Sequence, residues 1–266
     1  MNLKKFALNL RVQTLKMVHK ASASHIGSCL SMADLLTVLY EEILQIDPQD
    51  PENPDRDRFI LSKGHGGAIL YATLAAKGFF PTEWLDDYSQ NGSLLLGHIS
   101  HHVPGVEVST GSLGHGLPIG TGMALAGHRE HKDYRVFVLL SDGELDEGSN
   151  WEAILFAPHH GLDNLVTIID YNKIQSFGTV KEILNLDPLA DKFKAFGWSV
   201  KEIDGHDINE ISNTLNQVPF EKGKPSVIIA HTVKGKGVSF MEDQLAWHYK
   251  SPNKEQLEQA LDEIGR

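Results

Sequence analysis

The chain has 266 residues, 41% of them hydrophobic, and a formal net charge of −11. A chain of this length and hydrophobicity can bury a sizeable core, which disfavours a disordered or fibrous protein. Its negative charge disfavours general binding to nucleic acid or to an anionic membrane, because both surfaces would repel it. Small molecules and other proteins remain as partners.

The single cysteine, Cys29, excludes an intramolecular disulfide, and no apolar run reaches the roughly 20 residues that cross a bilayer. We therefore expect a soluble protein of a reducing, cytoplasmic compartment. The basic segment before Asp34, the first acidic residue, can mimic a transit peptide. An apolar stripe of helical period covers Leu3, Phe6, Leu10, Thr14 and Met17. This stripe has no cleavage-like break, so we predict a helix of the folded protein at this end.

Helical and strand patterns alternate along the rest of the chain. A helix is predicted over 31–45, followed by a loop rich in Pro and Asp at 47–58. Four apolar, β-branched runs typical of strands cover 135–141, 165–171, 198–203 and 226–231. Further helical patterns cover 113–131, 149–160, 188–197, 207–216 and 253–264. The alternation indicates an α/β fold with a mostly parallel, twisted sheet and helices on both faces.

The chain shows no repeat and no low-complexity linker. We therefore expect one domain over 1–266, with helical extensions at its N- and C-terminal ends.

Polar residues follow the predicted strands at their carboxyl ends, where ligands of parallel sheets bind. Asp142-Gly143 follows the first of the four strands and Asn172 follows the second, 30 residues after Asp142. Each position alone is equally typical of an ordinary turn, and nearby acidic residues suit the start of a helix. Together, Asp142 and Asn172 offer the hard oxygen ligands that Mg²⁺ or Ca²⁺ prefers, so they indicate a metal site.

The segment from Ser141 to Ile174 resembles the thiamin diphosphate motif, in which Gly-Asp-Gly lies about thirty residues before an Asn. Here Ser141 replaces the first glycine. Four further segments resemble the transketolase family in the family's own order: 24–31, 58–71, 104–126 and 232–248. The resemblance implies the thiamin-diphosphate-binding fold and transfer of a two-carbon ketol group from a ketose to an aldose.

The resemblance also implies roles for particular residues. Mg²⁺ or Ca²⁺ would be held by Asp142, Asn172 and the backbone carbonyl of Ile174, together with the diphosphate. Thiamin diphosphate would contact His65, Gly111, Ser112, Leu113, Asp142, Gly143, Asn172 and His248. We expect Gly143 to let the backbone approach the ligand closely, since a Cβ would obstruct it.

The catalytic positions implied by the resemblance are His25, His98, His248 and Glu147. An imidazole with a pKa near 6.5 suits proton movement on sugar hydroxyls. Glu147 would face the neighbouring active-site carboxylate across a subunit interface. Glu144 and Asp146 have no implied role and suit a helix start, and we interpret His206 as a loop-stabilising residue.

The resemblance ends with the diphosphate-binding domain. The pyrimidine-binding and C-terminal domains of the family, and the glutamate that activates the cofactor, have no counterpart in these residues. We therefore expect the N-terminal subunit of a split transketolase, whose partners are a C-terminal subunit and sugar phosphates. Pentose phosphates and a more specialised sugar pathway both stay open.

We predict an exposed apolar patch along 111–126 that makes a homodimer, or an α2β2 heterotetramer with the second subunit.

Three alternatives stay open at this point. Another thiamin diphosphate enzyme, such as deoxyxylulose-phosphate synthase or the alpha subunit of a 2-oxo acid dehydrogenase, shares the Asp and Asn pattern. A non-catalytic module that binds thiamin diphosphate is the second. A nucleotide-binding α/β protein is disfavoured, because the glycine-rich 110–116 lacks both the G-x-G-x-x-G spacing and a P-loop lysine.

Overall fold

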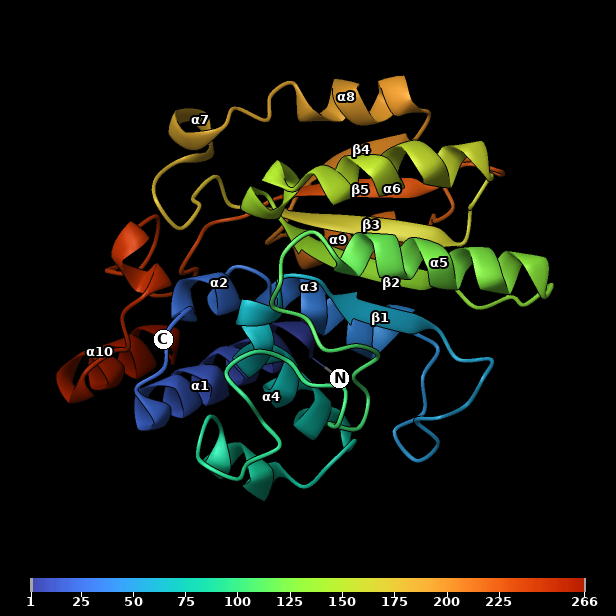
Figure 1. Ribbon diagram of the computed structural model, residues 1–266. Helices are drawn as coiled ribbons and strands as arrows, with labels where there is room; N and C mark the ends of the chain where they lie inside the picture. The colour runs from blue at the N-terminus through green and yellow to red at the C-terminus, as the bar shows by residue number, and fades with distance from the viewer. Residues whose placement is uncertain (1, 266) are drawn as a thin grey trace.

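A five-stranded sheet runs through the middle of the computed structural model, which describes residues 2–265 (Figure 1). Its strands are β1 (Arg58–Leu61), β2 (Val136–Ser141), β3 (Leu165–Tyr171), β4 (Ser199–Asp204) and β5 (Ser226–His231). They lie in the order β1-β2-β3-β5-β4, and every neighbouring pair is parallel. The predicted parallel α/β fold is confirmed.

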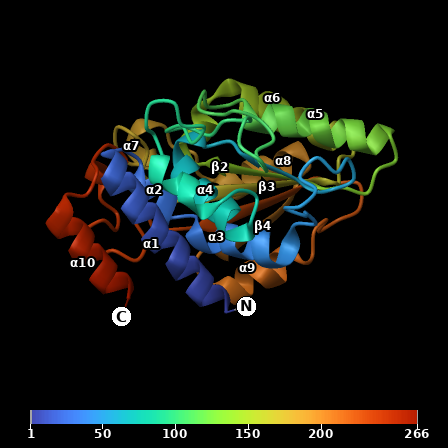
Figure 2. The same cartoon turned by 90° about the horizontal axis from the view of Figure 1, so that it is seen from below.

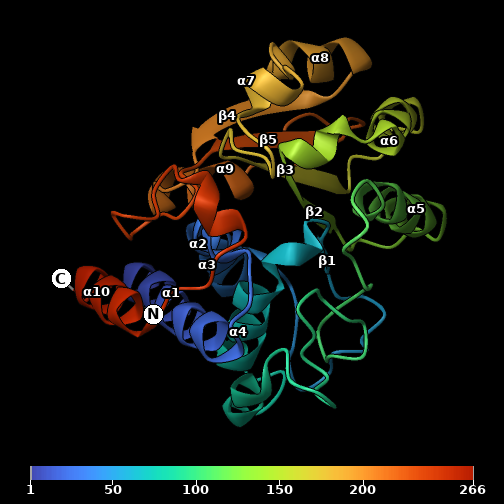
Figure 3. The same ribbon diagram turned by 60° about the vertical axis from the view of Figure 1, so that its left-hand side comes forward.

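Helices cover both faces of the sheet. They are α1 (Leu3–Ala21), α2 (Ile26–Leu30), α3 (Ala33–Val38), α4 (Gly67–Lys77), α5 (Gly116–Arg129), α6 (Gly148–His159), α7 (Val180–Ile183), α8 (Leu189–Phe196), α9 (Ile208–Leu215) and α10 (Lys254–Ile264). Short 3-10 turns cover Gly64–Gly66, Thr82–Asp87, Gly143–Asp146 and Leu245–His248, and a π-helical turn covers Leu39–Ile43. Figures 2 and 3 show α5 and α6 on one side of the sheet and α3 and α9 on the other.

The side chains of each strand point alternately into two hydrophobic cores. On β2, Phe137 and Leu139 pack into the core that contains α1, α3, α4 and α9. Val136, Val138 and Leu140 pack into the other core, beneath α5, α6 and α8. All of these side chains are buried, as expected for a parallel sheet covered on both faces. The loops at the carboxyl ends of the strands remain free to form a site.

The two ends of the described chain pack together, with α10 beside α1 (Figure 1). Ser251 Oγ donates to the carbonyl of Val18 at 3.0 Å, and the Nδ1 atom of His19 lies 2.7 Å from the carbonyl oxygen of Pro252. The predicted N-terminal helix is thus confirmed as α1. This packing brings the 245–253 segment next to the turn that follows α1.

Four strands or α-helices were missed by the sequence patterns, namely β1, α2, α4 and α7, and the helix predicted over 31–45 is not a single α-helix. β1 has only four residues, and α4 is buried on nearly all sides, so neither shows an amphipathic period. The predicted helix over 31–45 is in fact α3 followed by the π-helical turn Leu39–Ile43, preceded by the separate helix α2. The predicted helix over 113–131 begins at Gly116, because Gly114 has a φ of +83° that ends the loop in a left-handed conformation.

Within residues 2–265, no helix is both long and apolar enough to cross a membrane.

Candidate active site

Asp142 and Asn172 lie at the carboxyl ends of two adjacent strands, because β2 pairs directly with β3. Asp142 Oδ1 accepts from the N–H of Gly143 at 2.7 Å, and Oδ2 accepts from the N–H of Lys173. Asn172 Oδ1 accepts from the N–H of Ile174 at 3.2 Å. A carboxylate, an amide oxygen and the backbone of Ile174 therefore share one short edge of the sheet.

Burial raises the pKa of Asp142 to about 6, and the nearby carboxylate of Asp170 adds to this rise. A positive ion beside Asp142 would reverse the effect, since it would stabilise the ionised carboxylate. The site thus favours a cation.

The glycine-rich loop 110–116 is attached to the same edge by Glu144. This side chain is fully buried, and its carboxylate accepts from Ser62 Oγ, from the N–H of Gly114 at 3.0 Å and from the N–H of Ser141 at 3.4 Å. The loop passes so close to its neighbours that a Cβ on Gly114 would lie 2.6 Å from Glu147 Cβ. The interpretation of Glu144 as a helix-start charge was wrong, because it is a buried acceptor between three chain segments.

Four histidines from distant parts of the sequence gather above this edge. The ring centroid of His25 lies 5.2 Å from that of His65, 5.7 Å from His98 and 5.0 Å from His248. The rings of His65 and His248 are 5.8 Å apart. His25 has a φ of +72°, an uncommon conformation for a non-glycine residue, and its N–H donates to the carbonyl of His248 at 2.8 Å. Such strain persists where the surrounding structure enforces it, often at functional sites.

The environment keeps three of these imidazoles, those of His25, His65 and His248, neutral. Burial lowers the pKa of His25 to about 4, helped by His98 and by Lys234, and lowers the pKa of His248 to about 3. Burial also lowers the pKa of His65 well below its usual value. The sequence-based expectation assumed ordinary histidines, whereas in this pocket three of them act first as neutral hydrogen-bonding groups.

Two buried lysines lie close to this edge, and neither was recognised from the sequence. Lys234 lines the cavity, and Lys63 lies behind it. Lys63 forms an ion pair with Asp170, and both side chains are fully buried. Burial alone would raise the pKa of Asp170, but the Lys63 ammonium holds it below its usual value. Lys234 Nζ donates to the carbonyl of Ile174 at 2.9 Å and lies 3.0 Å from His248 Nδ1.

The four histidines and the Asp142–Asn172 edge line one cavity of about 260 Å³. It brings together His25, His65, His98, His248, Gly111, Leu113, Asp142, Gly143, Asn172 and Ile174, as well as Ser28, Ser141, Gln175, Ser176, Lys234 and Tyr249. Two residues of the sequence-based set, Ser112 and Glu147, are exposed and do not line it. A Cβ on Gly143 would lie 2.9 Å from Cγ of Gln175, which also lines the cavity. The crowding that this structure shows at Gly143 is therefore with a neighbouring side chain.

The donor set suits a cation shared with a ligand. Among residues 2–265, no cluster of three or more His, Cys, Asp or Glu side chains could hold a metal ion alone. The edge offers one carboxylate, one amide oxygen and one backbone carbonyl, all hard oxygen donors, and Mg²⁺ or Ca²⁺ needs six or more. Diphosphate oxygens and water would complete such a set, so the residues fit a metal–diphosphate pair.

Residues 3–265 match the sequence profile of the transketolase thiamine diphosphate-binding domain. This chain belongs to the transketolase family. The fold agrees, since the structure superposes on transketolase from Campylobacter jejuni with a TM-score of 0.95 at 34% identity, covering 100% of this chain and 43% of that one. Transketolase from Leishmania mexicana gives a TM-score of 0.94 at 31% identity, over 100% of this chain and 42% of that one.

The relatives are of two kinds, long transketolase chains and separate transketolase subunits of about the length of this chain. Human transketolase is 40% identical over 98% of this chain, which spans only 42% of the human protein. One subunit of the apulose-4-phosphate transketolase from Phocaeicola vulgatus is 45% identical over 96% of this chain and 90% of its own length. A 6-deoxy-6-sulfo-D-fructose transketolase subunit of Clostridium sp. is 44% identical over 96% of this chain and 93% of its own length.

Proposed function

We propose that this chain is the N-terminal subunit of a split transketolase that depends on thiamin diphosphate and a divalent metal. The observation that carries the proposal is the meeting of the Asp142–Asn172 edge and the four-histidine cluster in one cavity of a transketolase-family chain. The relatives that are themselves single subunits, matched over nearly their whole length, support the two-chain arrangement. We further propose that residues 1–266 form a single domain and that the protein is cytoplasmic.

In this proposal, Asp142, Asn172 and the carbonyl of Ile174 hold Mg²⁺ or Ca²⁺ against the diphosphate. When bound, thiamin diphosphate supplies the nucleophilic carbon that takes up and returns the two-carbon group. His65, Gly111, Leu113 and Gly143 contact the cofactor directly from the cavity wall. Ser112 reaches it only from the exposed side of the loop.

His25, His98 and His248 are placed to orient the substrate and to exchange protons with its hydroxyl groups. The neutral rings of His25 and His248 can each donate one hydrogen bond and accept another. Lys234, fully buried, brings an ammonium group to the cavity wall beside His248. Glu147, exposed at the start of α6, is left to face a second subunit.

The proposed assembly is a homodimer of this chain alone or an α2β2 heterotetramer with the C-terminal subunit, which would bring the pyrimidine-binding domain. The substrates are sugar phosphates or similar anionic sugars. Named relatives act on apulose 4-phosphate and on 6-deoxy-6-sulfo-D-fructose, so a specialised sugar fits the proposal as well as a pentose phosphate.

The test is reconstitution. The purified chain, a candidate C-terminal subunit and their mixture are assayed for ketol transfer with thiamin diphosphate and Mg²⁺. We expect turnover from the mixture and none from either chain alone. Substantial turnover from this chain alone would refute the split-subunit proposal, because an activating carboxylate would then have to lie within these residues.

A further inference from the structure

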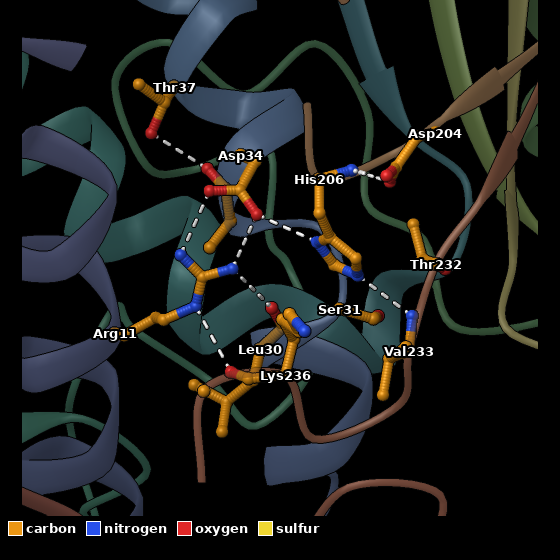
Figure 4. Close-up of polar contacts among 12 residues, drawn as sticks. Arg11, Leu30, Ser31, Asp34, Thr37, Asp204, His206, Thr232, Val233 and Lys236 are labelled. Carbon is orange, nitrogen blue, oxygen red and sulfur yellow. Dashed lines mark hydrogen bonds and ion pairs between the residues drawn. The ribbon is translucent and has the colours of Figure 1, made fainter. Parts of the chain in front are cut away.

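A largely buried chain of polar contacts lies outside the cavity and joins four segments of the fold (Figure 4). Arg11, on α1, donates from Nη1 and Nη2 to the two carboxylate oxygens of Asp34, on α3, at 3.0 and 2.6 Å. Asp34 Oδ2 lies 2.8 Å from His206 Nδ1, in the loop between β4 and α9. On its other side, His206 Nε2 lies 2.9 Å from the backbone nitrogen of Val233. The proposed catalytic chemistry uses none of these groups.

The contacts of His206 fix the position of its proton. The N–H of Val233 can only donate, so His206 Nε2 must be the unprotonated acceptor. Nδ1 therefore carries the hydrogen and donates it to Asp34. The neutral imidazole thus donates a hydrogen bond to the buried carboxylate of Asp34 and accepts one from the backbone that follows β5.

The backbone that His206 holds is anchored at several points. In the segment 232–236, Thr232 Oγ1 donates to Asp170, the N–H of Gly235 donates to the carbonyl of Gly27 at 2.9 Å, and the carbonyl of Lys236 accepts from Arg11 Nε at 3.2 Å. Lys234 is the residue between these anchors. Its side chain runs past Gly27, where a Cβ would lie 3.1 Å from Lys234 Cγ, and reaches Ile174 and His248 in the cavity.

We infer that His206 is a positioning residue, which sets the place of Lys234 in the cavity through its bond to Val233. Lys234 follows Val233 directly, so a displaced Val233 amide moves the origin of the lysine side chain. Arg11 bonds both oxygens of Asp34, so that ion pair survives without the imidazole. The effect of losing His206 is therefore local, on one wall of the cavity. The inference rests on the proposed function only where it concerns cofactor binding.

Two substitutions separate the two bonds of His206. In His206→Gln, the amide oxygen can occupy the place of Nε2 and accept from Val233. In His206→Asn, the shorter amide can replace Nδ1 and donate to Asp34 but cannot reach Val233. His231→Asn is the matched control, because His231 precedes the same segment but binds the exposed Glu202.

The direct readout is NMR of the whole chain. We expect the Val233 amide to exchange about 10-fold faster in His206→Asn, the scale of one lost hydrogen bond, and to keep its rate in His206→Gln and His231→Asn. The Gly235 amide is the internal reference. The ammonium ¹⁵N resonance of Lys234, assigned with Lys234→Arg, should shift in His206→Asn only. An unchanged Lys234 resonance in an Asn variant whose Val233 amide exchanges faster would overturn the inference.

A second readout is calorimetric titration with thiamin diphosphate and Mg²⁺. We expect affinity to fall about 10-fold in His206→Asn and to stay within about 3-fold of the wild type in His206→Gln. A wild-type chain that binds no cofactor with or without its partner contradicts the proposed function, while the NMR result still decides the role of His206. Should His206→Asn fail to fold, a Lys234 resonance displaced in His206→Gln would refute the inference by itself.

Discussion

Glu144 Oε1 accepts a hydrogen bond from the N–H of Gly114 at 3.0 Å, across 30 residues of sequence. The same carboxylate holds Ser62 and the backbone of Ser141, so the glycine-rich loop, β1 and β2 share one buried acceptor.

We therefore predict that Glu144→Ala lowers the free energy of unfolding by about 3 kcal/mol, because it leaves buried donors without partners. Glu144→Gln should cost less, since one amide oxygen still accepts. Urea denaturation measures both. Asp146→Ala, two residues further on, is the control, and an equal loss of stability in it would argue against the special place of Glu144.

The metal site gives the second prediction. Asp142→Ala removes the only carboxylate of the proposed oxygen set, so Mg²⁺-dependent binding of thiamin diphosphate should be abolished while the fold is kept. Asp142→Asn keeps an oxygen but loses the charge, and should bind more weakly than the wild type. Calorimetry with and without EDTA measures both variants. Wild-type affinity in Asp142→Ala would remove this residue from the site.

The third prediction concerns His25 and His248. In the reconstituted enzyme, His25→Ala and His248→Ala should each lower kcat by about 10²-fold or more, the usual scale for a lost acid–base group. Cofactor affinity should change much less. Exposed His128→Ala is the control. If both variants turn over at near-normal rates, these histidines serve only packing.

The same histidines predict how stability depends on pH. In the unfolded chain they protonate near pH 6.5, whereas burial lowers the folded-state pKa of His25 to about 4 and of His248 to about 3. Below pH 6.5 the unfolded chain thus binds more protons than the folded one, so stability is lost as pH falls from about 6.5 through 4. Urea unfolding at several pH values should show a weaker dependence in His25→Asn/His248→Asn than in His128→Asn. Equal slopes would contradict the assignment of the loss to these rings.

The surface patch predicted over 111–126 needs a correction before it is tested. Within that range the large apolar side chain that stands out from the surface is Ile119, at 37% exposure, because the outer face of α5 carries mostly small residues. Leu155, at 61%, and Phe156, at 41%, are the more exposed apolar side chains on helix α6, which packs beside α5.

We therefore expect Leu155→Glu to dissociate the proposed dimer. Leu8→Glu, at an exposed position of α1, should not change the oligomeric state. Sedimentation velocity distinguishes the species, and a mass unchanged by Leu155→Glu would place the interface elsewhere.

The sequence predicted the sheet and the residues at its edge well, because β2, β3 and β5 are apolar runs with polar residues directly after them. It missed β1 and α4, because their hydrophobic residues follow no regular period. It therefore also missed the buried groups that lie behind the edge of the sheet. Nothing in the sequence around Lys63 distinguishes it from an exposed loop lysine. Its complete burial against Asp170 depends on the order of the strands in the sheet. Ser112 and Glu147 were predicted as site residues but are exposed outside the cavity. A motif gives the spacing of such residues but not their exposure. His206 was interpreted as stabilising its own loop, whereas its ring reaches a segment 27 residues away.

The buried charged groups at this edge of the sheet have a consequence for how the site fills. Lys63 and Lys234 supply two ammonium groups, and Asp142, Glu144 and Asp170 supply three carboxylates, so these buried groups are within one charge of neutrality when all five are ionised. A bare diphosphate would add several uncompensated negative charges to a region of low dielectric, and a bare divalent cation would add two positive ones. When the diphosphate and the divalent cation bind together, their charges largely cancel. In the proposed holoenzyme, each ion would therefore bind more tightly once the other is present.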